Sequence, residues 1–227
     1  MRLLHGICPV VLLFAPSLSN RLGGLHATEP PAATIWRLDQ TAQVGGRPPT
    51  VLGEPHVVDD ATGKALHFNG ATDGLFVPVN PLEGVAQFTI EALINPDASG
   101  PAEQRFLHIQ DGPGHRVLLE IRLTGAGWAL DTYLRSEMPK SDCALLDRTK
   151  LHPANRWTWV ALVYANGHMA HYIDGTKELG GEVQFPPMAA GQISLGVRQN
   201  KVYWFKGGIR EVRFHPAALP AGQLQRR

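Results

Sequence analysis

Short apolar runs recur through the last third of the chain, and glycine, asparagine or aspartate lies within or close after each of them. They begin roughly ten to twenty residues apart, as successive strands do in all-β domains, and they occupy segments 155–164, 171–175, 193–198 and 205–214. No stretch of useful length shows helical periodicity, except the few residues after Leu219. Many short strands separated by turn residues are typical of an antiparallel β-sandwich.

The first two thirds of the chain continue this pattern. We expect strands at 34–38, near Val51, at 57–58 and at 88–96, and two more around a glycine turn within 65–77. Three further strands are expected at 105–110, 117–123 and 128–135. The sequences Gly-Pro-Gly (112–114) and Gly-Ala-Gly (125–127) between them predict short hairpin loops.

Two of these segments resemble a known family. The phrase Ala-Leu-His-Phe-Asn-Gly at 65–70, followed by Asp73 and a short apolar strand, and the strand 88–96 are similar to LamG-like jelly-roll domains of the concanavalin A-like superfamily. The resemblance implies an all-β, two-sheet antiparallel jelly-roll sandwich, in which 65–77 is the opening hairpin. We expect this domain to occupy residues 34–222. The fold serves lectins, enzymes and adhesion modules, so it leaves the function open.

The balance of charges excludes one group of partners. The chain has 20 acidic and 21 basic residues, so no net field draws it to nucleic acid or to an anionic membrane surface. Its hydrophobic content of 44% is sufficient for the core of one sandwich.

Residues 1–27 have the features of a cleavable signal peptide: a basic start, an apolar segment and small residues before Ala27. The Pro- and Ala-rich residues 28–33 are expected to be a linker. The apolar segment is far shorter than the ~20 residues of a membrane span. We therefore expect a secreted or periplasmic protein without a membrane span. Removal of the leader takes away Cys8 and leaves Cys143 without a disulfide partner.

Strand alternation predicts which polar side chains point away from the core. The odd positions of 117–123 are all apolar, so Glu120 and Arg122 share the opposite face. The same argument turns Asp131, Tyr133 and Arg135 outward from the next strand. Applied to the remaining strands, it completes a set of candidate ligand-binding residues: Glu91, His108, Glu120, Arg122, Tyr133, Tyr172 and Arg198.

The chemistry of this set favours a sugar ligand. In jelly rolls similar to this one, the concave face of one sheet is the usual binding groove. Adjacent strands lie ~4.8 Å apart, so side chains from several strands can reach one ligand. Arginine offers a planar fork for carboxylate or sulfate, and tyrosine offers a stacking surface with a polar tip. The alternative is an ordinary solvated face, on which Glu and Arg pair across strands.

Three functions remain open at this level. The first is non-covalent binding of a carbohydrate or another extracellular ligand. The second is a carbohydrate-active enzyme: Glu91 and Glu120 could form a hydrolase pair, or His108 and Tyr133 could serve a polysaccharide lyase. However, the E-x-D-x-x-E pattern of jelly-roll glucanases is absent, and we assign no catalytic residue. The third is an adhesive or structural module without a small-molecule site.

No cofactor is expected, and calcium is possible but not favoured. Asn69, Asp73 and Asp174 could offer oxygen ligands, but turn formation explains the first two better. Many LamG-like domains close with G-x-I-D-E-V, and this chain has Arg210 in place of that aspartate. A strand sends His168 and His171 to opposite faces, so they are not a metal pair. The resemblance also implies that Trp157 is buried.

Overall fold

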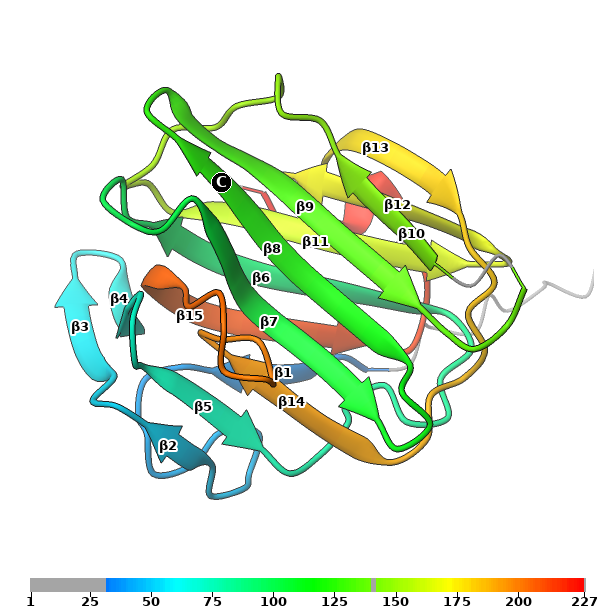
Figure 1. Cartoon of the computed structure of the whole chain (residues 1–227), viewed down its shortest axis with the longest axis horizontal. Coiled ribbons are helices and arrows are strands. Elements are labelled where there is room, and N and C mark those ends of the chain that lie inside the picture. Colours follow the sequence, from blue (N-terminus) through cyan, green and yellow to red (C-terminus); the bar gives the residue numbers. More distant parts are fainter. Residues whose placement is uncertain (1–31, 140–141, 227) are drawn as a thin grey trace, which may run out of the picture.

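The computed structural model describes residues 32–139 and 142–226, and in these residues fifteen strands form two antiparallel sheets packed face to face (Figure 1). The predicted two-sheet jelly-roll sandwich is therefore confirmed. The expected signal peptide 1–27, and all but two residues of the expected linker 28–33, lie outside the described residues.

The first sheet has the strand order β13-β12-β11-β6-β15-β4-β3, with β1 paired to β15. Its strands are β1 (Thr34–Arg37), β3 (His56–Asp60), β4 (Gly63–Asn69), β6 (Phe88–Pro96), β11 (Thr158–Ala165), β12 (His168–Ile173), β13 (Thr176–Glu182) and β15 (Lys206–His215).

The second sheet has the strand order β10-β9-β8-β7-β14-β5-β2. Its strands are β2 (Thr50–Leu52), β5 (Gly74–Val77), β7 (Glu103–Asp111), β8 (Arg116–Thr124), β9 (Gly127–Arg135), β10 (Asp142–Leu146) and β14 (Gly191–Leu195). The 3-10 helix η1 (Ala221–Gln223) follows the last strand. No helix in the described part of the chain has the length and apolar character to cross a membrane.

The core fills the space between the sheets and follows the predicted alternation. Val117, Leu119 and Ile121 of β8 are fully buried there, opposite Ile90 and Ile94 of β6. The predicted hairpins β7-β8 and β8-β9 are also confirmed.

The expected hairpin at 65–77 is wrong, because β4 and β5 belong to different sheets. Between β4 and β5 the chain crosses from one sheet to the other, and side-chain hydrogen bonds take the place of the backbone hydrogen bonds of a hairpin. The Asp73 carboxylate accepts hydrogen bonds from the backbone N–H groups of Asn69 and Glu54, at 3.1 and 2.9 Å. The Asn69 Oδ1 atom accepts from the N–H groups of residues 71–73. These bonds turn the chain out of one sheet and into the other.

Two strands at one end of the sandwich have no clear sequence signal. Strand β13 contains two glycines and only one large apolar residue, Leu179. Strand β10 begins in the polar stretch that precedes Cys143. The two edges approach each other, because a Cβ atom on Gly181 would lie 2.7 Å from the Cys143 sulfur. Cys143 therefore packs against the core, and burial raises the pKa of its thiol.

The C-terminal segment, residues 216–226, covers the outer face of the first sheet. Leu219 and Leu224 pack there on Ala161, with Val163 and Tyr172 beside them. The Glu91 side chain is buried under this segment, where its carboxylate accepts a 2.6 Å hydrogen bond from the N–H of Gln225 and contacts the His215 ring at 2.9 Å. This outer face is thus partly closed by the chain itself.

We expect Glu91→Ala to lower the free energy of unfolding by about 2–3 kcal/mol, because it leaves the buried N–H of Gln225 and the His215 ring without their partner. Urea denaturation measures this loss, and proteolysis should release the C-terminal segment earlier. Glu182→Ala, at an exposed position of β13, is the control. Equal stability of the two variants would show that Glu91 does not anchor the segment.

Candidate ligand-binding site

The outer face of the second sheet carries three rows of side chains that run across β9, β8 and β7. The strand registers place one residue of each strand in every row, and the rows are Asp131-Glu120-Arg105, Tyr133-Leu118-His108 and Arg135-Arg116-Gln110. Residues opposite each other in such a row are close enough for their side chains to touch. A β-bulge between Arg105 and Leu107 brings Arg105 to this face.

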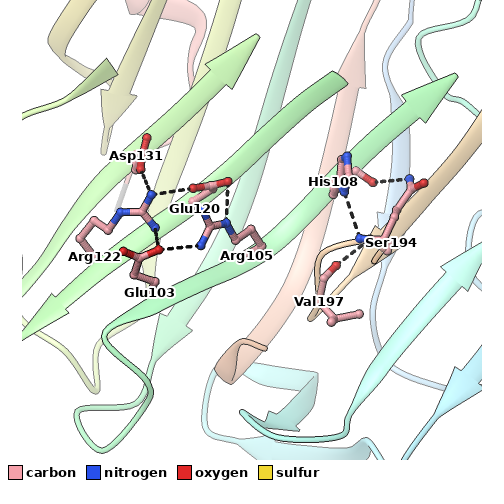
Figure 2. A network of polar contacts seen from close by, with 9 residues as sticks. Glu103, Arg105, His108, Glu120, Arg122, Asp131, Ser194 and Val197 are labelled. Carbon is pink, nitrogen blue, oxygen red and sulfur yellow. Dashed lines mark hydrogen bonds and ion pairs between the residues drawn. The ribbon is translucent and has the colours of Figure 1, made fainter. Parts of the chain in front are cut away.

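The first row, together with Arg122 and Glu103 beside it, forms a connected set of ion pairs (Figure 2). Arg122 lies among three carboxylates, at 2.5 Å from Asp131, 3.1 Å from Glu120 and 3.5 Å from Glu103. Arg105 joins Glu120 at 2.7 Å and Glu103 at 3.2 Å. The three carboxylates and two guanidinium groups therefore hold one another in place.

These groups are buried although they point away from the core. Glu120 is 3% and Asp131 is 4% exposed. Burial raises the pKa of both carboxyls, while the adjacent Arg105 and Arg122 oppose that rise. Since their oxygens already contact guanidinium groups, these carboxylates are poorly placed to exchange protons with a substrate.

A hollow of 220 Å³, which we call the arginine pocket, opens beside this network. Its floor has an apolar part made by Leu118 and Ala144, and the half-buried Tyr133 adjoins it. Its lining residues are Arg105, Arg116, Leu118, Glu120, Arg122, Asp131, Tyr133, Ala144 and Arg198. Four arginines against two carboxylates leave an excess of positive charge in the lining.

Arg116 and Arg198 differ from the other two arginines. Neither forms an ion pair within the described residues, whereas Arg105 forms two and Arg122 forms three. They are therefore the guanidinium groups that are available to a ligand.

The loop of residues 196–205, the Arg198 loop, holds Arg198 over the sheet. The Gln199 N–H donates to His108 Nδ1 at 3.0 Å, and the N–H of Arg105 donates to the Tyr203 carbonyl at 2.9 Å. The Tyr203 ring lies 3.8 Å from the Arg105 guanidinium carbon. The loop begins at Gly196 (φ 79°), where a Cβ atom would lie 2.3 Å from the Phe68 ring.

His108 lies next to the pocket as a neutral, buried ring. Burial lowers its pKa to about 3, and the charges of Arg198, Arg116 and Arg105 act in the same direction. Because Nδ1 accepts a hydrogen bond from Gln199, the proton of the neutral ring is on Nε2. The Nε2 atom has no partner among the described residues.

The structure brings together five of the seven residues predicted from the sequence. Glu120, Arg122, Tyr133 and Arg198 line the pocket, and His108 adjoins it. Glu91 and Tyr172 do not belong to this group, and the expectation of one shared face is corrected for them. Both lie on the outer face of the first sheet beside the C-terminal segment, because β6 and β12 are strands of that sheet. Glu91 and Glu120 therefore cannot form a catalytic pair.

Sequence reasoning missed Arg105, Arg116 and Ala144. Arg116 is an even-numbered position of β8, as Leu118 and Glu120 are, so it lies on the same face. The strand was predicted to start at residue 117, and a start one residue earlier would have placed Arg116 among the candidates. In a regular strand Arg105 would lie on the same face as the buried Leu107, two residues later. It faces outward because of the β-bulge between them, which the sequence pattern does not predict. Ala144 belongs to β10, which was not predicted.

The other polar groups considered for metals have structural contacts. Arg210, in place of the family's aspartate, pairs with Asp60 at 2.8 Å and lies 4.1 Å from the Trp157 ring. Trp157 is half-buried at this contact, so the expectation that it is a buried core residue is wrong. Within residues 32–139 and 142–226, no three or more His, Cys, Asp or Glu side chains are grouped to hold a metal ion.

Comparison with known families agrees with the fold. The family model Laminin_G_3, described as concanavalin A-like lectin/glucanases superfamily, matches residues 69–225. The chain belongs to this superfamily. No curated protein sequence matches it.

Several solved structures share the concanavalin A-like architecture. Domain 4 of AbnA, a GH43 extracellular arabinanase from Geobacillus stearothermophilus, aligns with a TM-score of 0.66 and 23% identity over 86% of this chain and 97% of that one. The CBM40 of the Ruminococcus gnavus IT-sialidase aligns with a TM-score of 0.57 and 18% identity over 70% and 94%. A SAP-like pentraxin from Limulus polyphemus gives a TM-score of 0.54 and 18% identity over 69% and 77%. At these identities the similarity shows a shared fold.

The buried His108 makes a prediction about pH. An unfolded histidine titrates near 6.5, so below that pH the unfolded chain binds a proton that the native ring rejects until about pH 3. The free energy of unfolding should therefore fall as the pH drops below 6.5. We expect His108→Gln to remove roughly 2 kcal/mol of the decrease between pH 7 and pH 4.5.

Urea denaturation of both proteins at the two pH values measures this difference. His171, whose pKa burial lowers to about 4, is present in both proteins and cancels in the comparison. His168→Gln, at an exposed site, is the control and should leave the decrease unchanged. An identical decrease in wild type and His108→Gln would contradict the assignment of a neutral buried ring.

Proposed function

We propose that this protein binds carbohydrate non-covalently in the arginine pocket on the outer face of its second sheet. One observation carries the proposal: an apolar floor, a half-buried tyrosine ring and two guanidinium groups that form no ion pair with any described residue line the same hollow. Sugars present apolar C–H faces and a rim of hydroxyl groups, so they need this combination of surfaces.

The pocket is organised before a ligand arrives. Arg122 and Arg105 are fixed by their carboxylates, and the backbone of the loop that carries Arg198 is bonded to β7 and β14. The frame of the pocket therefore needs little reordering on binding, and the side chains that become ordered are those of Arg116 and Arg198.

Similar folds are known in complex with oligosaccharides. The AbnA domain was solved with arabinotriose and the CBM40 with α2,3-sialyllactose. These ligands belong to those proteins, and they support the proposal by showing that this architecture can carry a glycan.

The contacts of the carboxyl groups favour ligand binding over catalysis. Glu120 and Asp131 both contact Arg122, and Glu91 lies on the other sheet. A glycoside hydrolase needs one carboxyl group free to donate a proton and a second to act as base or nucleophile.

We also propose that the protein acts outside the cytoplasm, as a secreted or periplasmic module. The signal-like features of residues 1–27 support this location. The AbnA domain comes from an extracellular enzyme, which is consistent with it.

We expect Tyr133→Ala to weaken glycan binding by about tenfold or more, the effect of losing one stacking aromatic ring. A glycan array should identify a ligand, and titration calorimetry should compare the wild type with the variant. Tyr172→Ala, on the outer face of the first sheet, is the matched control and should bind normally. The thermal unfolding of each variant shows whether it remains folded.

The proposal fails if no glycan binds, or if Tyr172→Ala weakens binding as much as Tyr133→Ala while both variants remain folded.

A further inference from the structure

The arginine pocket adjoins a second hollow on the same sheet face. This hollow has a volume of 440 Å³, and we call it the amide hollow. Its lining residues are Pro78, Gln110, Asp111, Gly112, Ala190, Gly191, Gln192 and Gln199. Gln110 lies directly opposite Arg116 in the β7-β8 ladder, so the two hollows meet at this pair.

The two hollows differ in charge. Among the described residues, Asp111 is the only ionisable side chain that lines the amide hollow, and its oxygens are occupied by the N–H groups of Gly114, His115 and Ala189 and by the His115 ring. The Gln199 amide is also occupied, because it donates to the carbonyls of His108 and Gln192 and accepts from the Gln192 side chain. The groups that remain for a ligand are the neutral amides of Gln110 and Gln192, which donate and accept hydrogen bonds with hydroxyl groups.

The arginine pocket has the opposite character. Arg116 and Arg198 line it without ion pairs among the described residues. A guanidinium group binds a carboxylate or sulfate through two parallel hydrogen bonds and cannot lose its charge. Glu103 adds a negative charge at the rim, but it is already paired with Arg105 and Arg122.

We propose that the site binds an anionic oligosaccharide whose carboxylate or sulfate group is held by Arg116 and Arg198 in the arginine pocket. The adjoining sugar unit lies in the amide hollow, where its hydroxyl groups contact Gln110 and Gln192 and the Gln199 side chain holds Gln192 in place. The ligand runs across the strands, from β8 and β9 toward β7 and β14. These strands span on the order of 10 Å, which more than one sugar unit can cover. This inference rests on the proposed carbohydrate binding and specifies its ligand class.

The test compares acidic glycans with neutral counterparts of the same length. The uronate arm uses trigalacturonate and its methyl ester, and the sulfate arm uses a sulfated galactan hexasaccharide, which has no carboxylates, and its desulfated form. We expect the acidic member of at least one pair to bind at least about tenfold more tightly, the worth of one charge-assisted hydrogen bond. The arm that responds identifies the anionic group.

Three variants and a change of salt locate the effect. Arg116→Gln and Arg198→Gln should each remove most of the preference for the acidic member, whereas Arg156→Gln, on an exposed loop, should keep it. The affinity for the acidic member should fall as sodium chloride is raised. Gln110→Ala should weaken binding of the trisaccharide more than binding of monomeric galacturonate.

Failure of this inference is distinguishable from failure of the proposed function. If neutral glycans bind as tightly as acidic ones and Tyr133→Ala still abolishes binding, the carbohydrate site stands and the anionic ligand is overturned. If no glycan on the array binds, or if Tyr133→Ala leaves the binding of every glycan that does bind unchanged, the carbohydrate site itself is overturned.

Discussion

Glu120 lies between two guanidinium groups, and the outer face of the second sheet depends on this contact. A carboxylate that is only 3% exposed is costly unless it is paired, and Arg105 and Arg122 pair with it from both sides. The same arrangement fixes Arg122 against Asp131 and brings Glu103 into the set. Because these charges are satisfied within the set, Arg116 and Arg198 have no carboxylate partner in the part of the chain that the structure describes, and the hollow beside them gains its positive character.

The two outer faces of the sandwich differ in which segments of the chain cover them. The first is covered by the C-terminal segment, which uses Glu91 as a buried anchor and packs Leu219 and Leu224 on β11. The second carries the Arg198 loop over β7 and β14, and the arginine pocket opens beside the buried ion pairs of β8 and β9. Which chemistry is available to a ligand is therefore decided by what the chain folds over each sheet, as well as by the strand patterns.

The arrangement of the two sheets explains which features of the fold and the site could be predicted from the sequence and which could not. Period-two alternation in 117–123 and 128–135 correctly separated core residues from outer ones, because both strands are regular. It could not assign strands to sheets, so Glu91 and Tyr172 were grouped with residues of the other sheet. The β-bulge that turns Arg105 outward and the crossing at 70–73 are set by local backbone geometry, which alternation does not encode. Strands β10 and β13 are stabilised by their neighbours, and their own composition gives little sign of them.

The central claim is that one outer face, and not the other, binds the ligand. Backbone amide NMR during a glycan titration tests it most directly, because each strand reports separately. We expect chemical-shift changes in β7, β8, β9 and the Arg198 loop, and none in β11 and β12. Shifts concentrated in β11, β12 and the C-terminal segment, with β8 and β9 silent, would contradict it.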